Sequence, residues 1–267
     1  MTGRPSAGKV IAELRELGDP AQREGMARFG IATDHALGGI NLPTLRAIGR
    51  RIGVDHDLAG RLWASGIHEA RILAGYVDDP AQVTEEQMEM WAADFDSWDI
   101  VDNMCGDLFD RTPFAYEKAV AWARRDEEFV KRAGFALMAR LAVHDKATPD
   151  RVFGAFLPII ERESGDRRNF VRKAVNWALR EIGKRSAVLN AMAIRTAQRI
   201  HSQGPPAGRW VASDALRELR SDAVRSRLRQ REAAVAILRS RLSERQTEDG
   251  QAGAPVRARR PRRATRS

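Results

Sequence analysis

The segment FVKRAGFALMAR (residues 129–140) returns in altered form 41 residues later as FVRKAVNWALRE (170–181). A fainter version, IHEARILAGYV, occupies residues 67–77. Apolar residues in these segments recur every three or four positions, which is the periodicity of an amphipathic helix. Helical units that repeat at about this period are typical of HEAT-like arrays, in which each unit buries its apolar face against its neighbours. The sequence therefore predicts an all-α, HEAT-like helical-repeat solenoid with a concave surface.

The rest of the chain also favours helices, because strand-like alternation and Gly-rich hairpin turns are scarce. Helix starts are expected at Thr84 in TEEQMEMW and at Ser213 in SDALREL, where a capping residue precedes early acids. We expect one helical-repeat domain over residues 1–220, a charged C-terminal helix over 221–246 and a disordered, Arg-rich tail over 247–267.

Composition restricts the function classes. With 43% hydrophobic and 30% charged residues, the chain reads as a soluble globular protein. Its single cysteine, Cys105, excludes an internal disulfide and a cysteine-based zinc site. The five histidines are scattered without an HExxH pattern, so neither a metal nor another cofactor is expected. No apolar signal core or membrane span is visible, and a cytoplasmic location is expected.

The positive charge is concentrated at one end of the chain. The formal net charge is +9, and residues 251–267 contribute six arginines and no acid, which leaves +3 for the remainder. Such a tail could hold phosphates through counterion release. It could equally be a solubilising end, and composition alone leaves both possibilities open.

The segment FDSWDIVDN (95–103) places acids beside a tryptophan. A helix from Ser97 onward would bury a stripe made of Val101, Met104, Cys105 and Leu108. Trp98 and Asp102 then share one edge of that stripe, neither fully buried nor fully solvated. Capping by Ser97 or Asp96 and the helix dipole explain Asp96 and Asp99 well, but they explain Asp102 less well.

The helix that starts at Phe170 gives a parallel result. Trp177 projects from one edge of its core stripe, and Lys173, Arg180 and Lys184 share that side. An aromatic ring among three cations could support a polyanion backbone. The alternative is a tryptophan packed against the next repeat and covered by lysine stems. In HEAR (68–71), His68 and Glu69 are expected to make structural hydrogen bonds at a repeat boundary.

Three segments together resemble a known family. SWDIVDN is similar to the Trp-Asp-x-x-Asp segment of the bacterial alkylpurine DNA glycosylases of the AlkD type. FVKRAGFALMARL resembles their Arg-Ala helix, and FVRKAVNWALREIGKR resembles their Lys-Ala-x-x-Trp-x-Leu-Arg-Glu helix. The order of the three segments matches the family, and the resemblance covers about residues 24–220.

The resemblance implies a function and a site. The family hydrolyses the N-glycosidic bond of cationic N3- and N7-alkylated purines in double-stranded DNA, and it is understood to do so without base flipping. Carried over, Asp102 corresponds to the catalytic aspartate, Trp98 and Trp177 to two cleft tryptophans, and Arg132 to the cleft arginine. We expect Lys173, Arg180 and Lys184 to extend a concave basic groove. The resemblance further implies a DNA glycosylase domain over residues 1–220 and an association with the nucleoid, and the solenoid prediction favours a monomer.

Three alternatives remain open. The chain could keep the fold and only bind damaged or branched DNA. It could be a HEAT-type protein-interaction scaffold, whose DNA binding would be absent or insensitive to salt. It could also bind DNA without sequence preference through the tail alone.

Overall fold

The structure is a computed structural model, and it describes residues 4–31, 34–234 and 237. Within these ranges every regular element is a helix, which confirms the all-α prediction. The elements in chain order are α1 (Ala7–Leu17), η1 (Pro20–Gln22), α2 (Arg23–Arg28), α3 (Leu42–Ile52), α4 (His56–Trp63), α5 (His68–Val77), α6 (Glu85–Ala93), α7 (Trp98–Asp107), η2 (Phe109–Arg111), α8 (Ala115–Trp122), α9 (Glu128–His144), α10 (Asp150–Gly154), α11 (Leu157–Glu163), α12 (Asn169–Gly183), α13 (Ala187–Gln203) and α14 (Pro206–Leu219).

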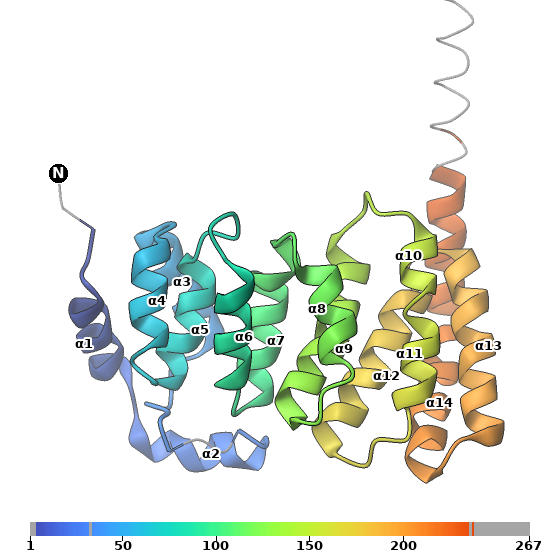
Figure 1. The fold of residues 1–267 in the computed structure, drawn as a ribbon, viewed down its shortest axis with the longest axis horizontal. Coiled ribbons are helices and arrows are strands. Elements are labelled where there is room, and N and C mark those ends of the chain that lie inside the picture. Colours follow the sequence, from blue (N-terminus) through green and yellow to red (C-terminus); the bar gives the residue numbers. More distant parts are fainter. Residues whose placement is uncertain (1–3, 32–33, 235–236, 238–267) are drawn as a thin grey trace, which may run out of the picture.

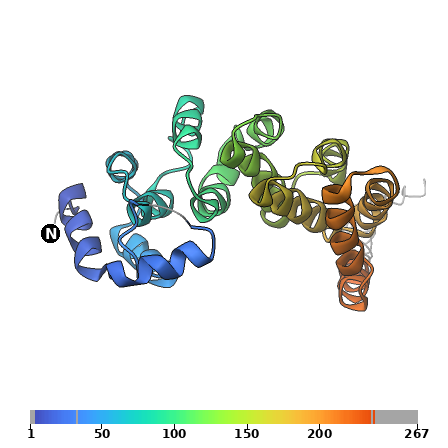
Figure 2. The ribbon, with the colours of Figure 1, turned by 90° about the horizontal axis from the view of Figure 1, so that it is seen from below.

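The helices form two layers that run side by side along the molecule (Figure 1). One layer holds α4, α6, α8, α10, α11 and α13. The other holds α3, α5, α7, α9, α12 and α14. The row curves, and the second layer lies on the concave side (Figure 2). This arrangement is the expected HEAT-like solenoid, in which paired helices stack only on their neighbours.

The repeated segments occupy equivalent places in the concave layer. They correspond to α5, α9 and α12, and α9 packs directly on α12. Phe129 and Phe170, which match each other in the repeat, lie side by side with ring centroids 5.5 Å apart. The repeat in the sequence therefore reflects helices that bury the same face against successive partners.

The helix boundaries mostly follow the capping signals. Thr84 caps α6, where its hydroxyl accepts a hydrogen bond from the Gln87 backbone nitrogen at 3.1 Å. The predicted helix start at Ser213 is wrong, because α14 begins at Pro206 and runs through this position. The Ser213 hydroxyl instead donates to the Arg209 carbonyl at 2.8 Å, which satisfies it inside the helix.

The expected C-terminal helix is described in part. Residues 222–234 are helical, and Val224 and Leu228 on this stretch are buried. The rest of the predicted 221–246 helix, apart from residue 237, lies outside the described residues, and so does the 247–267 tail. None of the described helices is long and apolar enough to cross a membrane.

The contact between α8 and α9 is close enough to require glycine at position 134. A Cβ added there would lie 2.9 Å from the Cα of Ala123 and from the carbonyl carbon of Trp122. These are backbone atoms, so they cannot move aside as a flexible side chain would. Gly134→Ala is therefore expected to lower the free energy of unfolding by about 1–3 kcal/mol, measured by urea denaturation.

Gly60 is the matched control for this substitution. It lies in α4, and a Cβ added there would meet nothing within 4 Å. Gly60→Ala should leave stability unchanged or raise it by up to about 1 kcal/mol, because alanine is the better helix former. Equal losses in the two variants would show that close packing at Gly134 is unimportant.

Candidate functional site

The six tryptophans divide into two groups by burial. Trp63, Trp91 and Trp122 are core residues, and the rings of Trp63 and Trp91 stack with centroids 4.2 Å apart. The other three are partly or largely exposed, and each has an arginine guanidinium over its ring. The pairs and their distances from guanidinium carbon to ring centroid are Trp98 with Arg132 (5.8 Å), Trp177 with Arg140 (5.0 Å) and Trp210 with Arg172 (4.6 Å).

These three pairs link consecutive helices of the concave layer, since they join α7 to α9, α9 to α12 and α12 to α14. Each pair places a guanidinium against a flat apolar ring, although Arg132 itself is buried. Aromatic surfaces combined with arginine are the features that proteins use to hold nucleic-acid strands. The concave layer therefore carries a series of groups suited to a polyanion.

Asp102 lies within this series and is held by Arg132. The Arg132 Nε and Nη2 atoms donate to the two carboxylate oxygens of Asp102 at 3.1 and 2.8 Å. A third nitrogen, Nη1, donates to the carbonyl oxygen of Phe170 at 2.7 Å. The side chains of Asp102 and Arg132 are 17% and 7% exposed. The structure thus brings Asp102, Arg132 and Trp98 together, and it places Asp102 at the partly buried edge predicted from helix geometry.

Burial and the neighbouring charges shift the pKa of the Asp102 carboxyl group in opposite directions. Burial raises the pKa of Asp102 above its usual 3.8, and the neighbouring cations Arg132 and Arg140 limit the rise. The net effect is a raised pKa. Asp102 is therefore protonated at a higher pH than an ordinary aspartate.

Arg140 is a site residue that the sequence analysis missed. Its Nη2 lies 3.4 Å from the Asp102 carbonyl oxygen, and its guanidinium covers Trp177. Its Nε is buried and has no partner among the described residues. The position of this arginine depends on Gly106, where an added Cβ would overlap the guanidinium. Arg140 follows Arg132 by eight residues of α9, and that spacing on one helical face was the available signal.

Trp98 is fixed from outside the repeat that contains it. Its indole Nε1 donates to the carbonyl oxygen of Phe29, just beyond the end of α2, at 3.0 Å. Phe29 itself is 75% exposed. Because these residues are 69 positions apart in the chain, no local pattern revealed the contact. The N-terminal segment therefore takes part in positioning the site.

Asp99 is buried, so the helix dipole is not its main partner. Its Oδ2 lies 2.9 Å from Nε2 of His68, and the Ser97 hydroxyl contacts its other oxygen. Glu69 accepts hydrogen bonds from the backbone nitrogens of Leu37 and Gly38, both at 2.8 Å. The predicted structural role of His68 and Glu69 is confirmed by these bonds.

The three cations expected beside Trp177 have other partners or are exposed to solvent. Lys173 is exposed on α12. Lys184 forms an ion pair with Glu218 of α14 at 2.7 Å, and Arg180 binds the same carboxylate. The charges of Arg180 and Lys184 are thus compensated between α12 and α14, and Arg140 is the cation that covers the Trp177 ring.

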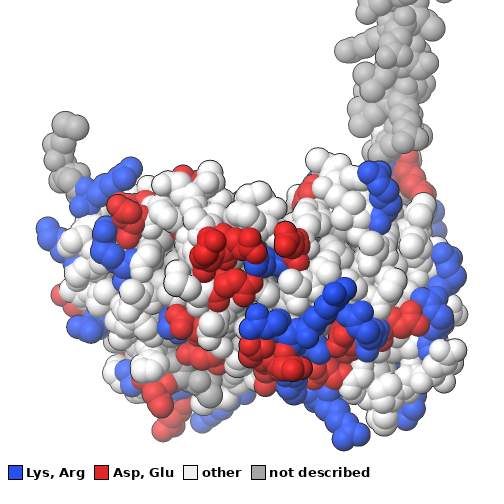
Figure 3. Space-filling view, viewed as in Figure 1, with Lys and Arg blue, Asp and Glu red and all other residues white. Residues whose placement is uncertain are grey.

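The opposite face of the molecule has a different character. Acidic side chains gather over α6 in the view of Figure 3, which shows the layer of α6 and α8. Two of them, Glu85 and Glu89, hold the buried Lys118 at 2.7 and 2.6 Å. Basic side chains gather beside this acidic patch in the same view, so the face carries both signs of charge. In the described part of the chain, no group of three or more His, Cys, Asp or Glu side chains could hold a metal ion.

A family model described as DNA alkylation repair enzyme matches residues 10–219. The chain belongs to the DNA alkylation repair enzyme family. A solved structure from a family related to the HEAT-like repeat DNA glycosylases, with affinity for branched DNA structures, is similar with a TM-score of 0.68. The two chains share 18% sequence identity, and the match covers 84% of this chain and 96% of that chain. This likeness shows the HEAT-like fold. No curated protein gives a significant match to the chain.

Arg132 lowers the pKa of Asp102, and substitution of Arg132 tests this effect. Because the guanidinium lowers the pKa of the carboxyl group against the effect of burial, Arg132→Gln should raise the pKa of Asp102 further. Titration of the Asp102 carboxyl carbon by NMR measures this shift directly. Arg195→Gln, on the exposed surface of α13, is the control and should leave that pKa in place. An unshifted pKa in Arg132→Gln would contradict the role of this ion pair.

Proposed function

We propose that this protein is a DNA glycosylase that hydrolyses the N-glycosidic bond of cationic N3- and N7-alkylated purines in duplex DNA. The observation that carries the proposal is a partly buried carboxylate, Asp102, held by a bidentate arginine between Trp98 and the Arg140–Trp177 pair. Membership of the DNA alkylation repair enzyme family supports the same reaction class.

The chemistry requires little beyond this carboxylate. An alkylated purine is already cationic, so when the bond from C1′ breaks the base leaves with the electron pair and becomes neutral. Positive charge then develops on the deoxyribose, and a nearby carboxylate stabilises it. Water adds to C1′, and its proton passes to the carboxylate or to solvent. Asp102 supplies both the negative charge and the acceptor that orients the water.

The hydrogen bonding of Asp102 also allows this carboxylate to orient the attacking water. Each carboxylate oxygen of Asp102 accepts one hydrogen bond from Arg132 and retains further acceptor capacity. Trp98 and Trp177 are partly exposed, so each offers a flat face to the deoxyribose from outside the base stack. We therefore include cleavage without base flipping in the proposal. Arg140 and Arg172, with Trp210, would contact the phosphates on either side.

A second candidate function is binding of branched or damaged DNA without cleavage. Arg132 engages both oxygens of Asp102, which is the arrangement expected of a structural ion pair. The similar solved structure also comes from a family with affinity for branched DNA structures. Excision assays separate this candidate from the first, since both predict salt-sensitive DNA binding.

Asp102→Asn tests the proposed function most simply. Release of free base from duplex DNA containing N7-methylguanine should fall by about 100-fold or more, because a neutral amide cannot offset the charge on the sugar. DNA affinity should stay within about twofold, since the amide keeps the shape of the carboxylate. The control is Asp107→Asn, which removes a charge from the same helix at a side chain that is 28% exposed and should release base at the wild-type rate.

An unchanged rate in Asp102→Asn would remove Asp102 from the reaction. The absence of base release by the wild-type protein, with DNA binding intact, would favour the binding-only function. These two outcomes are distinct, because only the second concerns the wild type.

Trp177→Ala should reduce base release by at least about tenfold, which corresponds to a loss of about 1.4 kcal/mol of transition-state stabilisation. The ring is partly exposed, and Arg140 covers it. Single-turnover kinetics measure the rate per folded molecule, and thermal unfolding measures stability separately.

Tyr116→Ala is the control for the loss of a partly buried aromatic residue. Tyr116 lies on α8, where it stacks on Phe156. This variant should lose stability without losing activity per folded molecule. If Trp177→Ala behaves in the same way, then Trp177 is only a packing residue.

A further inference from the structure

The net positive charge of the described part of the chain lies after the helical repeats. Residues 1–219 contain 31 basic and 31 acidic side chains, so their formal net charge is zero. Residues 220–234 contain five arginines and two acids, which gives a net charge of +3. The match to the family model ends at residue 219, so this charge lies beyond the part of the chain that the family shares. Long-range attraction of a polyanion depends on net charge, which the segment after the repeats supplies here.

The helix over residues 222–234 is fixed to the end of the solenoid. Ser221 caps it, since its hydroxyl oxygen accepts a hydrogen bond from the Val224 backbone nitrogen at 3.3 Å. Val224 and Leu228, which are one turn apart, are 5% and 6% exposed. Arg231 Nη1 donates to two carbonyl oxygens just after α12 ends, at 3.0 and 3.3 Å. The other arginines of this helix therefore have a defined place in the fold.

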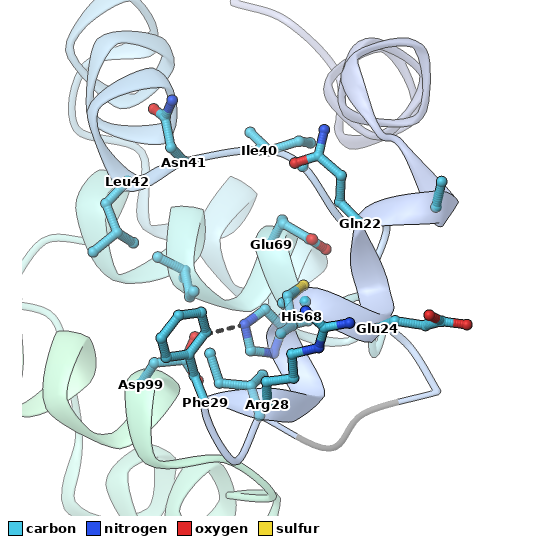
Figure 4. Close-up of a pocket in the computed structure, with 16 residues that line it drawn as sticks. Gln22, Glu24, Arg28, Phe29, Ile40, Asn41, Leu42, His68, Glu69 and Asp99 are labelled. Carbon is cyan, nitrogen blue, oxygen red and sulfur yellow. Dashed lines mark hydrogen bonds and ion pairs between the residues drawn. The ribbon is translucent and has the colours of Figure 1, made fainter.

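Three exposed arginines of this helix, Arg225, Arg227 and Arg229, form no ion pair within the described residues. Arg225 and Arg229 are one turn apart and share a face of the helix. On α2, at the other end of the molecule, the same spacing separates the acid Glu24 from the cation Arg28 (Figure 4). Opposite charges at this spacing stabilise a helix, whereas two like charges repel each other. An anion that binds beside Arg225 and Arg229 would relieve this repulsion.

The position of this helix makes its positive charge accessible from the concave side. Figure 2 shows the helix next to α14, on the concave side at the C-terminal end of the row. Burial and the nearby cations Arg231 and Arg185 lower the pKa of Lys146, so the potential is positive at this end. The surface of the helix is continuous with the layer that carries the pairs of arginine and tryptophan.

We propose that the helix over residues 222–234 is a second DNA-binding surface, which holds the phosphate backbone of the duplex beyond the nucleotide at Asp102. Arginine suits this role, because its guanidinium donates charge-assisted hydrogen bonds to phosphate oxygens. A duplex that lies along the concave layer reaches this helix after it passes α14. The choice of DNA as the ligand rests on the proposed function. The contact contributes to affinity and takes no part in bond cleavage.

Two double variants of equal net charge test the proposal. Arg225→Gln with Arg229→Gln removes two charges from the helix. The matched control is Arg151→Gln with Arg195→Gln, which removes two exposed charges from α10 and α13 in the other layer. Both variants keep the whole chain, so residues 251–267 contribute equally. Affinity for an undamaged duplex of about 30 base pairs is measured by fluorescence anisotropy at several salt concentrations.

The affinity of the variant at Arg225 and Arg229 should fall by about tenfold. The slope of log K against log salt concentration should become shallower by about 1.8, because each phosphate contact contributes about 0.9. The control should keep the wild-type slope. A wild-type slope in the variant at Arg225 and Arg229, or an equal change in the control, would overturn the proposal.

A charge-preserving variant separates electrostatic contact from packing. Arg225→Lys with Arg229→Lys should keep the wild-type salt slope, since both cations remain. A slope as shallow as that of the glutamine variant would show that charge is not what these positions supply, and the proposal would be wrong.

Base release distinguishes failure of this proposal from failure of the proposed function. At saturating protein, the glutamine variant at Arg225 and Arg229 should release base at the wild-type single-turnover rate, because Asp102 and Arg132 are unchanged. A slower rate at saturation would place the helix in the reaction and overturn a role in affinity alone. Absence of base release by the wild type would contradict only the proposed function, since the binding measurements do not require cleavage.

Discussion

The pairing of Asp102 with Arg132 is the constraint on which the site depends. A carboxylate that is only 17% exposed must be paired, since an unpaired buried charge is costly. Arg132 meets this requirement with two hydrogen bonds, and its third bond goes to the Phe170 carbonyl oxygen. One side chain therefore joins α7, α9 and the first turn of α12. The same contacts therefore stabilise the charge of Asp102 and the stacking of the repeats.

Two further pairs of an arginine and a tryptophan lie along the concave layer beyond Asp102 and Arg132. Arg140 lies over Trp177 and contacts the Asp102 backbone, and Arg172 lies over Trp210. In each case a cation is held against a flat ring, so the surface offers positive charge together with an apolar face. Such a surface suits a sugar–phosphate backbone, whose sugars are apolar and whose phosphates are anionic. On the opposite face, an acidic patch over α6 lies beside a stretch of basic side chains.

The sequence was informative where the pattern is local. The 41-residue repeat predicted the concave helices, because each unit buries the same face. Helix geometry also placed Asp102 at a partly buried edge, as observed. The helix start predicted at Ser213 was wrong, because a serine followed by an acid can also occur inside a helix. Here the helix begins earlier, at Pro206. Arg140, Trp210 and Phe29 were missed because their contacts join different helices, and helical periodicity does not report which faces meet.

The most direct test of a catalytic carboxylate is the pH dependence of single-turnover base release, corrected for spontaneous loss of the cationic base. The proposed reaction requires Asp102 to be ionised, and burial raises the pKa of this carboxyl group above 3.8. The rate should therefore fall as the pH is lowered through a single ionisation above 3.8, at the pKa that NMR assigns to Asp102. A rate that stays constant through the NMR-determined pKa of Asp102 would contradict this mechanism.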